Sequence, residues 1–547
     1  MATALAISAC GGSESDSDDQ PVDTGAENDG DPADTVDVTV QPDGATNSTA
    51  VPDTGGDSSA SGAFDEDATF TQVVSTYPAT LSPHLNPFQG QAEAFFVALH
   101  DRLLYVDPLT GELGPMLATA WEVDPDSSSI TFTLRDDVTF HDGAPFTAES
   151  VVANVDHALS MGAEHTYAGL YEMVSGAEAV DEYTVRYDFT GSFAGGLLEM
   201  FAGGLGMFLS PETLGNDDPT QVVGTGPFEI GSVRAGSSYE FPAYDAYWNP
   251  DAQNFAQLDI VVVESGDTAL NGIATGEYDT AILDWSLKAR VDELDTVQSE
   301  TAAGTGTMLL TINTEVMEGG NDPAVRLAIN TAIDRQALAE GALRGGCVAT
   351  VQPWNESLPG HNPDYPADYY GSDPQRAREI LTEAGFPDGI SIDLNTYTIP
   401  LYVPIAEVLQ SQLAEAGIDA TINQLESSTL ISGFATDKSL DTWLSRFPFG
   451  GPPARLFPLW WFPGGGPNPG GWHDETIDEI YPEFMSEPDA AEQAALLQQV
   501  SARLVEAPAA QIFLCHEMQL WVAGEDVVGL QPLTFGYDYS RLGIQGS

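Results

Sequence analysis

The sequence predicts an α/β protein in which two or three domains share a bilobal core. The chain has 547 residues, which exceeds the size of one usual domain. From Ala68 onwards, segments with a strand pattern alternate with amphipathic helical segments, an order typical of α/β architecture. Hydrophobic residues make up 42% of the chain, which is enough for large buried cores.

The first predicted elements are strands followed by a helix. Residues 69–74 (TFTQVV) are rich in β-forming side chains and indicate a strand. Residues 130–134 (ITFTL) alternate well, and we expect them to form a hairpin with residues 138–140 across a short polar turn. Thr147 is a good N-cap, because its hydroxyl can accept a hydrogen bond from the first helical turn. It therefore predicts a helix that continues to Asn154.

One strand and four helices are predicted in the middle of the chain. The run QLDIVVV has the length and composition of a buried strand. Pro323 suits a first helical turn, where its missing N–H costs nothing. Gly385 and Gly417 are each expected to end an amphipathic helix. The predicted strand covers 257–263, and the predicted helices cover 269–274, 323–333, 374–384 and 404–416.

The first 67 residues differ in character from the rest. Residues 1–10 end in Ile-Ser-Ala-Cys, which resembles a bacterial lipobox, the motif whose cysteine thiol is acylated to anchor a lipoprotein. We expect a signal remnant at 1–10 and lipidation at Cys10; the alternative is an ordinary apolar N-terminus with a chance cysteine. Residues 11–67 hold 16 acidic side chains and no basic one, so we expect a disordered acidic tether.

The acidic composition excludes several classes of partner. The formal net charge is −68, and −52 remains when residues 11–67 are left out. A surface this acidic repels phosphate backbones and anionic headgroups, so nucleic acid is not an expected partner. In a salty medium the repulsion would be screened, and we attribute the charge to habitat rather than to ligand. The sequence contains no run of 18 apolar residues, so no transmembrane helix is predicted.

Enzyme motifs and metal motifs are missing from the sequence. There is no Gly-x-Ser-x-Gly elbow, and His516-Glu517 lacks a second histidine, since position 520 is leucine. The eight histidines are scattered, so we expect no metal site, no cofactor and no catalytic residue. Cys347 and Cys515 could pair in an oxidising compartment, but their separation in sequence leaves the disulfide open.

Six segments, in order along the chain, resemble the family 5 extracellular solute-binding proteins, which serve peptide, dipeptide and nickel importers. Together they cover most of the region from about residue 70 to 540. The segments are 115–121 with 130–151 (PMLATAW, ITFTLRDDVTFHDGAPFTAESV), 224–228 (GTGPF), 269–270 with 276–279 (AL, GEYD), 322–335 (DPAVRLAINTAIDR), 373–386 (DPQRAREILTEAGF) and 412–418 (QLAEAGI).

The resemblance implies a bilobal, class II periplasmic-binding-protein-like fold with an additional small domain on the first lobe. Ligand would bind between the lobes. We expect lobe I at 68–110, 220–308 and 518–547, the additional domain at 111–219, and lobe II at 309–517.

The resemblance also implies a function. We expect the exported substrate-binding component of an ABC importer, anchored by Cys10 to the outer face of the cytoplasmic membrane. As a monomer, it would carry an oligopeptide or related small solute to a membrane permease. The alternatives are an oligosaccharide-binding relative, a nickel or nickel-chelate carrier, and a ligand-sensing lipoprotein without a transporter.

Ligand-lining residues are expected late in the chain, where aromatic side chains are interleaved with glycine and proline. Aromatic faces suit peptide side chains or sugar rings, although some of these residues will be core. Where peptide-binding relatives place an aspartate for the α-amino group of the peptide, this chain has Arg446. An arginine would repel an ammonium and could clamp a carboxylate, or it could form an ion pair within the protein. The candidate residues are Trp443, Arg446, Phe447, Phe449, Trp460, Trp461 and Trp472.

Overall fold

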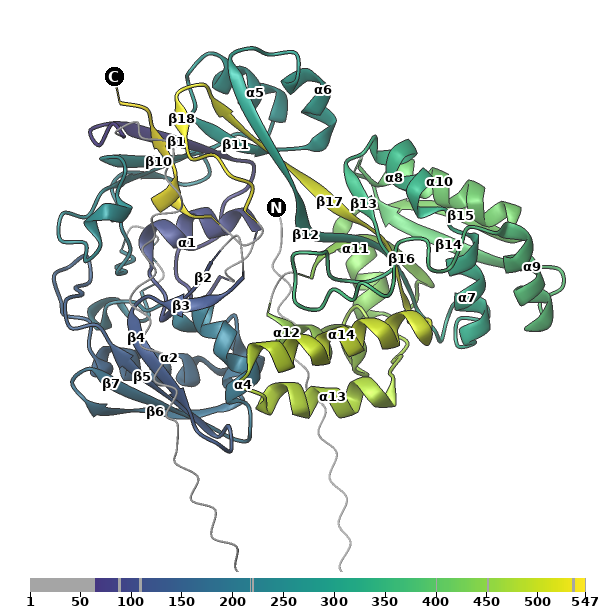
Figure 1. Ribbon diagram of the computed structural model, residues 1–547, viewed down its shortest axis with the longest axis horizontal. Helices are drawn as coiled ribbons and strands as arrows, with labels where there is room; N and C mark the ends of the chain where they lie inside the picture. The colour runs from purple at the N-terminus through teal and green to yellow at the C-terminus, as the bar shows by residue number, and fades with distance from the viewer. Residues whose placement is uncertain are drawn as a thin grey trace, which may run out of the picture.

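The computed structural model describes residues 64–86, 90–107, 111–216, 218, 221–399, 401–449, 452–533 and 537–546. Within these ranges the chain is α/β, as predicted, with one nine-stranded sheet, one four-stranded sheet and three two-stranded sheets (Figure 1). The predicted signal remnant at 1–10, Cys10 and the predicted tether up to residue 63 lie outside the described residues. Phe64 forms a bridge with Gln545, so the end of the predicted tether packs against the C-terminal segment.

Two long antiparallel strands, β12 and β17, run through both parts of the large sheet (Figure 1). Their pairing breaks between Ala303 and Thr307. On one side of the break β17 pairs with β11, and on the other side β12 pairs with β16. The break therefore divides the sheet into a first and a second half. The strands, in sheet order, are β16 (Thr442–Pro448), β12 (Val297–Ile312), β17 (Gln511–Gly524), β11 (Thr280–Leu283), β1 (Thr69–Val74), β10 (Gln257–Val262), β9 (Ser238–Pro242) and β8 (Val233–Arg234), and β13 (Cys347–Ala349) pairs with β17.

The first half is built around β1, which lies parallel to β10 and β11. Alternate side chains of β1 enter two different cores, as expected of a strand covered on both faces. Phe70 packs in the cluster that holds Phe95 of α1, and Val73 packs in the cluster that holds Leu270 of α5. The predicted strands at 69–74 and 257–263 and the helix at 269–274 are confirmed. Other elements here are α1 (Glu93–Leu99), α5 (Gly266–Ala274), α6 (Lys288–Val291), β18 (Val527–Val528) and β19 (Gly543–Ile544).

A four-stranded antiparallel sheet forms a separate layer, and α2 packs on it. The predicted strand at 130–134 is confirmed, but its predicted hairpin with 138–140 is wrong. Both edges of β5 are occupied, by β4 and by β7, so residues 138–140 fold back on 144–146 instead. Thr147 caps α2 as predicted, and Ser150 completes a capping box. The elements are β2 (Leu104–Val106), β3 (Leu113–Pro115), β4 (Ala118–Val123), β5 (Ser129–Leu134), β6 (Val174–Asp181), β7 (Thr184–Phe189), α2 (Ala148–Met161), α3 (Ala168–Tyr171) and α4 (Ala194–Leu197).

In the second half, helices cover β14 and β15, which are parallel and joined by α10. Ile405, Leu409 and Leu413 recur every four residues along α10 and are fully buried. Gly385 and Gly417 follow their helices with φ of +95° and +84°, the left-handed conformation that glycine adopts without penalty. The predicted helices are confirmed as α7 (Pro323–Ala332), α9 (Pro374–Glu383) and α10 (Tyr402–Glu415); α8 (Arg335–Leu343), α11 (Ser427–Ile431), β14 (Ile390–Tyr397) and β15 (Ile418–Leu425) complete the half.

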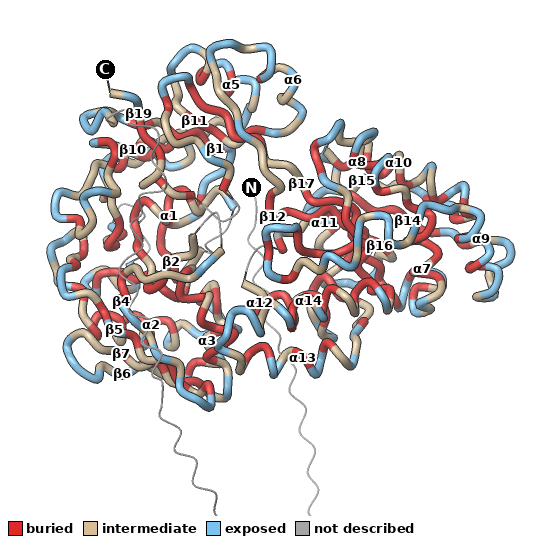
Figure 2. The backbone as a smooth tube through the Cα atoms, viewed as in Figure 1, coloured by how far each residue is buried: buried red, intermediate tan, exposed pale blue. Residues whose placement is uncertain are grey.

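A helical segment between β16 and β17 brings the second half to the four-stranded sheet. Its apolar side chains and those of the four-stranded sheet form one continuous buried cluster. Figure 2 shows buried stretches, in red, along the elements of both parts. The elements are α12 (Pro453–Leu456), the π-helical turn η9 (Phe457–Trp461), α13 (Glu475–Ser486) and α14 (Ala490–Glu506). No helix in the described ranges combines the length and the apolarity needed to cross a membrane.

Candidate functional site

Five of the seven predicted ligand-lining side chains are buried in this conformation. Their exposed fractions do not exceed 9%, so packing covers them almost completely. Phe447 is half-buried, and Arg446 is exposed. The buried residues are Trp443, Phe449, Trp460, Trp461 and Trp472.

The buried aromatic residues fall into two packing groups. Trp460 contacts Phe447 and Phe449, with ring centroids 4.5 Å and 5.2 Å away. Trp443 lies apart from this group and packs on Phe434 at 5.4 Å. Of the candidate aromatic side chains, Phe447 thus remains the one with a partly exposed face. Ligand contact by the other five would require the covering segments to move.

Arg446 and Glu517 form a bidentate ion pair. Arg446 lies on β16 and Glu517 on β17, and the guanidinium donates through Nε and Nη2 to the two carboxylate oxygens. Burial lowers the pKa of Arg446, but attraction to Glu517 outweighs it, so the pKa lies above its usual value. Of the two alternatives for Arg446, the ion pair within the protein is therefore the arrangement in this structure. A ligand carboxylate would have to compete with Glu517.

Gly306 makes this ion pair geometrically possible. Strand β12 lies between β16 and β17, so the two side chains must meet above it. A Cβ on Gly306 would overlap the Glu517 carboxylate and would stand 2.5 Å from Nε of Arg446. With any side chain at position 306, the flexible ends of Arg446 and Glu517 would have to shift from the arrangement in which they pair. The signal in the sequence was a glycine inside a strand pattern.

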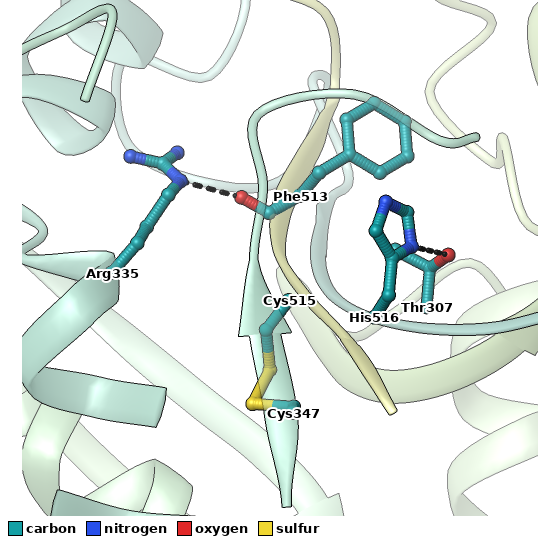
Figure 3. Close-up of a disulfide and its surroundings, with 6 residues drawn as sticks. All are labelled: Thr307, Arg335, Cys347, Phe513, Cys515 and His516. Atoms are coloured by element: carbon teal, nitrogen blue, oxygen red, sulfur yellow. Dashed lines mark hydrogen bonds between the residues drawn. A yellow bond between two sulfur atoms is a disulfide. The ribbon is translucent and has the colours of Figure 1, made fainter. Parts of the chain in front are cut away.

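A disulfide joins Cys347 on β13 to Cys515 on β17 (Figure 3). Cys347 pairs in register with Glu517, so the disulfide and the ion pair are neighbours on these strands. His516 follows Cys515 and points to the opposite side, where its Nδ1 lies 3.0 Å from the Thr307 hydroxyl. Burial lowers the pKa of His516 to about 3, so the ring is neutral at physiological pH. Arg335 donates through Nε to the Phe513 carbonyl at 2.7 Å. The segment 513–516 is thus fixed by covalent and polar contacts on both faces.

His84 packs near two histidines that are more than 70 residues further along the chain, His157 on α2 and His165 shortly after it. The ring of His84 lies 5.3 Å from that of His157 and 5.2 Å from that of His165. Burial lowers the pKa of His84 to about 4 and that of His165 to about 3. His84 Nε2 lies 3.2 Å from Asn154 Oδ1. Across the part of the chain that is described, no group of three or more His, Cys, Asp or Glu is arranged to hold a metal ion.

A buried carboxyl group connects the first half to the four-stranded sheet. Asp101 accepts hydrogen bonds from Tyr247 Oη at 3.0 Å and from Trp248 Nε1 at 2.7 Å. The guanidinium of Arg135, at the end of β5, lies over the Trp248 ring at 4.0 Å. Burial raises the pKa of Asp101 to about 7, although both hydrogen bonds lower it. The network holds the first half of the large sheet against the four-stranded sheet and contains none of the predicted ligand residues.

Comparison with protein families and sequences identifies similar proteins. The family model "Bacterial extracellular solute-binding proteins, family 5 Middle" matches residues 112–469. The chain is 30% identical over 328 residues to the glutathione-binding protein GsiB of Salmonella paratyphi A. The matched region covers 57% of this chain and 61% of GsiB. It is 26% identical over 384 residues to the dipeptide-binding protein of Escherichia coli K12, covering 63% and 69%. The matched region is thus less than two thirds of the length of GsiB.

Solved structures show the same fold over nearly the whole described chain. The periplasmic binding protein DppA of Helicobacter pylori, in complex with peptide STSA, gives a TM-score of 0.73 at 21% identity and covers 88% of this chain and 99% of that one. NikA of Brucella suis, in complex with Fe(III)-EDTA, gives a TM-score of 0.75 at 23% identity and covers 87% and 100%. The predicted bilobal periplasmic-binding-protein-like fold is confirmed.

Proposed function

The chain belongs to the family 5 bacterial extracellular solute-binding proteins, and from this premise we propose that it is the substrate-binding component of an ABC importer for oligopeptides or a related small solute. The observation that carries the proposal is the family match over residues 112–469 on a sheet divided into two halves. The family consists of binding proteins, and we assign no catalytic step to this chain.

The break in the β12–β17 pairing supports a hinge between two lobes. Backbone hydrogen bonds resist bending where a ladder is continuous, and the ladder is interrupted between Ala303 and Thr307. Gly304 and Gly306 lie at the break and restrict the backbone least. In the proposal, lobe I comprises 68–110, 220–308 and 518–547, the additional domain 111–219 and lobe II 309–517.

Ligand would favour the closed state because it contacts both lobes only when they meet. A ligand shifts such an equilibrium by its difference in affinity for the two states. Arg446 and Phe447 are the candidate ligand contacts with exposed surface, next to the proposed hinge. Since Glu517 already neutralises Arg446, a peptide carboxylate would bind there by exchanging one carboxylate for another.

The proposed setting is outside the cytoplasmic membrane. Lipidation at Cys10 would anchor the chain to the outer face of the membrane, and residues 11–67 would act as an acidic tether to the folded body. The proposed partner is a membrane permease, which would receive ligand from a monomeric binding protein. The disulfide between Cys347 and Cys515 supports an oxidising compartment.

Native mass spectrometry of the purified protein tests the ligand class. A carried-over peptide mass, and a rise in melting temperature with glutathione or the dipeptide Met-Leu, are expected. A carried-over sugar mass would replace the peptide assignment with an oligosaccharide. If saturating ligand leaves the radius of gyration unchanged in X-ray scattering, closure of two lobes is refuted.

A further inference from the structure

The lobes are joined by β12 and β17, and the second lobe also meets the additional domain, with which it shares one buried cluster. There the short helix α4 of the additional domain contacts the last turn of α13. The Ser127 hydroxyl, from the β4–β5 turn, donates to the carbonyl of Ser486 at 2.5 Å. Ser127 and Met485 are almost completely buried, so the contact excludes water. In Figure 1 this contact lies at the bottom of the molecule, whereas β12 and β17 join the lobes in its upper part.

Two consecutive glycines form the α4 side of this contact. A Cβ on Gly195 would overlap the backbone carbonyl of Glu487, and a Cβ on Gly196 would come within 2.5 Å of Met485 Sδ. Neither glycine has a positive φ, so the backbone conformation does not require glycine. Glycine at these two positions therefore allows α13 to approach α4 closely.

Each side of the contact is fixed to a different lobe. The segment carrying α13 is held to the second lobe, because Gln511 donates to the Trp460 carbonyl and Thr314 donates to the Gly470 carbonyl. The additional domain is held to the first lobe by Arg135, which follows β5 and whose guanidinium lies over the ring of Trp248, itself hydrogen-bonded to Asp101. A hinge movement at β12 and β17 must therefore open or close the contact between α4 and α13.

We propose that the contact of Gly195 and Gly196 with Met485–Glu487 is a latch that closes when the two lobes close. This inference rests on the proposed function and adds a regulatory surface made of residues other than the candidate ligand contacts. Closing the latch buries apolar surface and pairs the Ser127 hydroxyl, so it favours the closed state before ligand contributes. The apparent ligand affinity scales with the fraction of protein in the binding-competent state, so a weakened latch lowers affinity without touching the ligand.

A cysteine pair across the latch tests the proposal without ligand. In Ser127→Cys/Ser486→Cys, mild oxidation is expected to form a crosslink, verified by peptide mapping that also shows the native disulfide intact. The crosslinked protein is expected to have a smaller radius of gyration than the two single-cysteine variants, because the open state is removed. Equal radii would show a permanent contact and would overturn the latch.

Hydrogen exchange on a glycine variant provides a second ligand-free measurement. Gly195→Ala is expected to increase exchange at the amides of α4 and of residues 485–487, because the backbone of Glu487 cannot yield to the new methyl group. Gly341→Ala is the matched control, since a Cβ there meets nothing within 4 Å. Unchanged exchange in the folded Gly195→Ala variant would contradict the latch. Neither measurement uses a ligand. The latch can therefore be refuted while the proposed ligand binding stands, and the proposed ligand binding can be refuted while the latch stands.

Discussion

Removal of the disulfide between Cys347 and Cys515 is expected to be strongly destabilising. The two cysteines are 168 residues apart in the sequence. A crosslink lowers the conformational entropy of the unfolded chain by an amount that grows with the closed loop, and for this length the chain-entropy relation gives about 5 kcal/mol at 25 °C. Folded domains are stable by about 5–15 kcal/mol, so the crosslink would supply a third or more of the free energy of unfolding.

Three variants separate the covalent bond from the packing of the sulfur atoms. Both cysteines are buried, with exposed fractions of 5% and 0%, so each alanine also removes a buried atom at a cost of about 1 kcal/mol. Cys347→Ala and Cys515→Ala each break the same bond. Each single variant is therefore expected to lose about 6 kcal/mol, and the double variant about 7 kcal/mol rather than the sum.

The assay is guanidinium unfolding followed by the fluorescence of the nine tryptophans. Reduction of the wild-type protein under denaturing conditions, followed by refolding with blocked thiols, gives an independent comparison. If the double variant loses as much stability as the two single variants together, the reasoning is refuted. Independent packing losses add, whereas the loss of one shared bond is counted only once. A loss below about 2 kcal/mol in the double variant would equally refute the entropic contribution.

Three further predictions concern charge. Gly306→Ala and Arg446→Met should each lower the free energy of unfolding by about 1 kcal/mol or less, because the side chain of Arg446 is 39% exposed. The double variant should lose no more than either single variant. Additive losses would show that the glycine does not serve the ion pair with Glu517. Raising NaCl from low to molar concentration should raise the melting temperature, because it screens repulsion within a chain of net charge −68; a steady fall would contradict this. Folding raises the pKa of Asp101 from 3.8 to about 7, so the contribution of this carboxyl group to stability is present below pH 4 and is lost as pH rises through 7. Asp101→Asn should therefore flatten the dependence of the free energy of unfolding on pH between pH 4 and 7. An unchanged slope in the variant would contradict this prediction.

Local signals in the sequence were sufficient for most helices and for the buried strands. Thr147, Gly385 and Gly417 act through hydrogen bonds or backbone angles within a few residues, so their roles can be read without tertiary structure. The hairpin at 130–140 failed for the opposite reason. Which strands flank β5 depends on β4 and on β7, and β7 begins at Thr184, which local pattern cannot reveal.

The candidate site was harder to predict because its contacts are distant in sequence. Glu517 lies 71 residues from Arg446, and nothing near either residue indicates the pair. The glycine- and proline-rich surroundings of Trp460 and Trp461 suggested a loop that lines the ligand site. The structure instead places both indoles in a core shared with the four-stranded sheet. Composition describes how a segment can bend, whereas burial depends on what packs over it.

The strongest restraints on β12 and β17 lie on one side of the proposed hinge. The disulfide at Cys515 and the ion pair at Glu517 tie β17 to β13 and β16, which belong to the proposed lobe II, next to the break that ends at Thr307. Movement is therefore directed to the few residues around Gly304, where the ladder is interrupted. On this reasoning the Cys347→Ala variant should lose stability yet retain the same closed radius of gyration with ligand, because the crosslink lies within lobe II and not across the moving boundary.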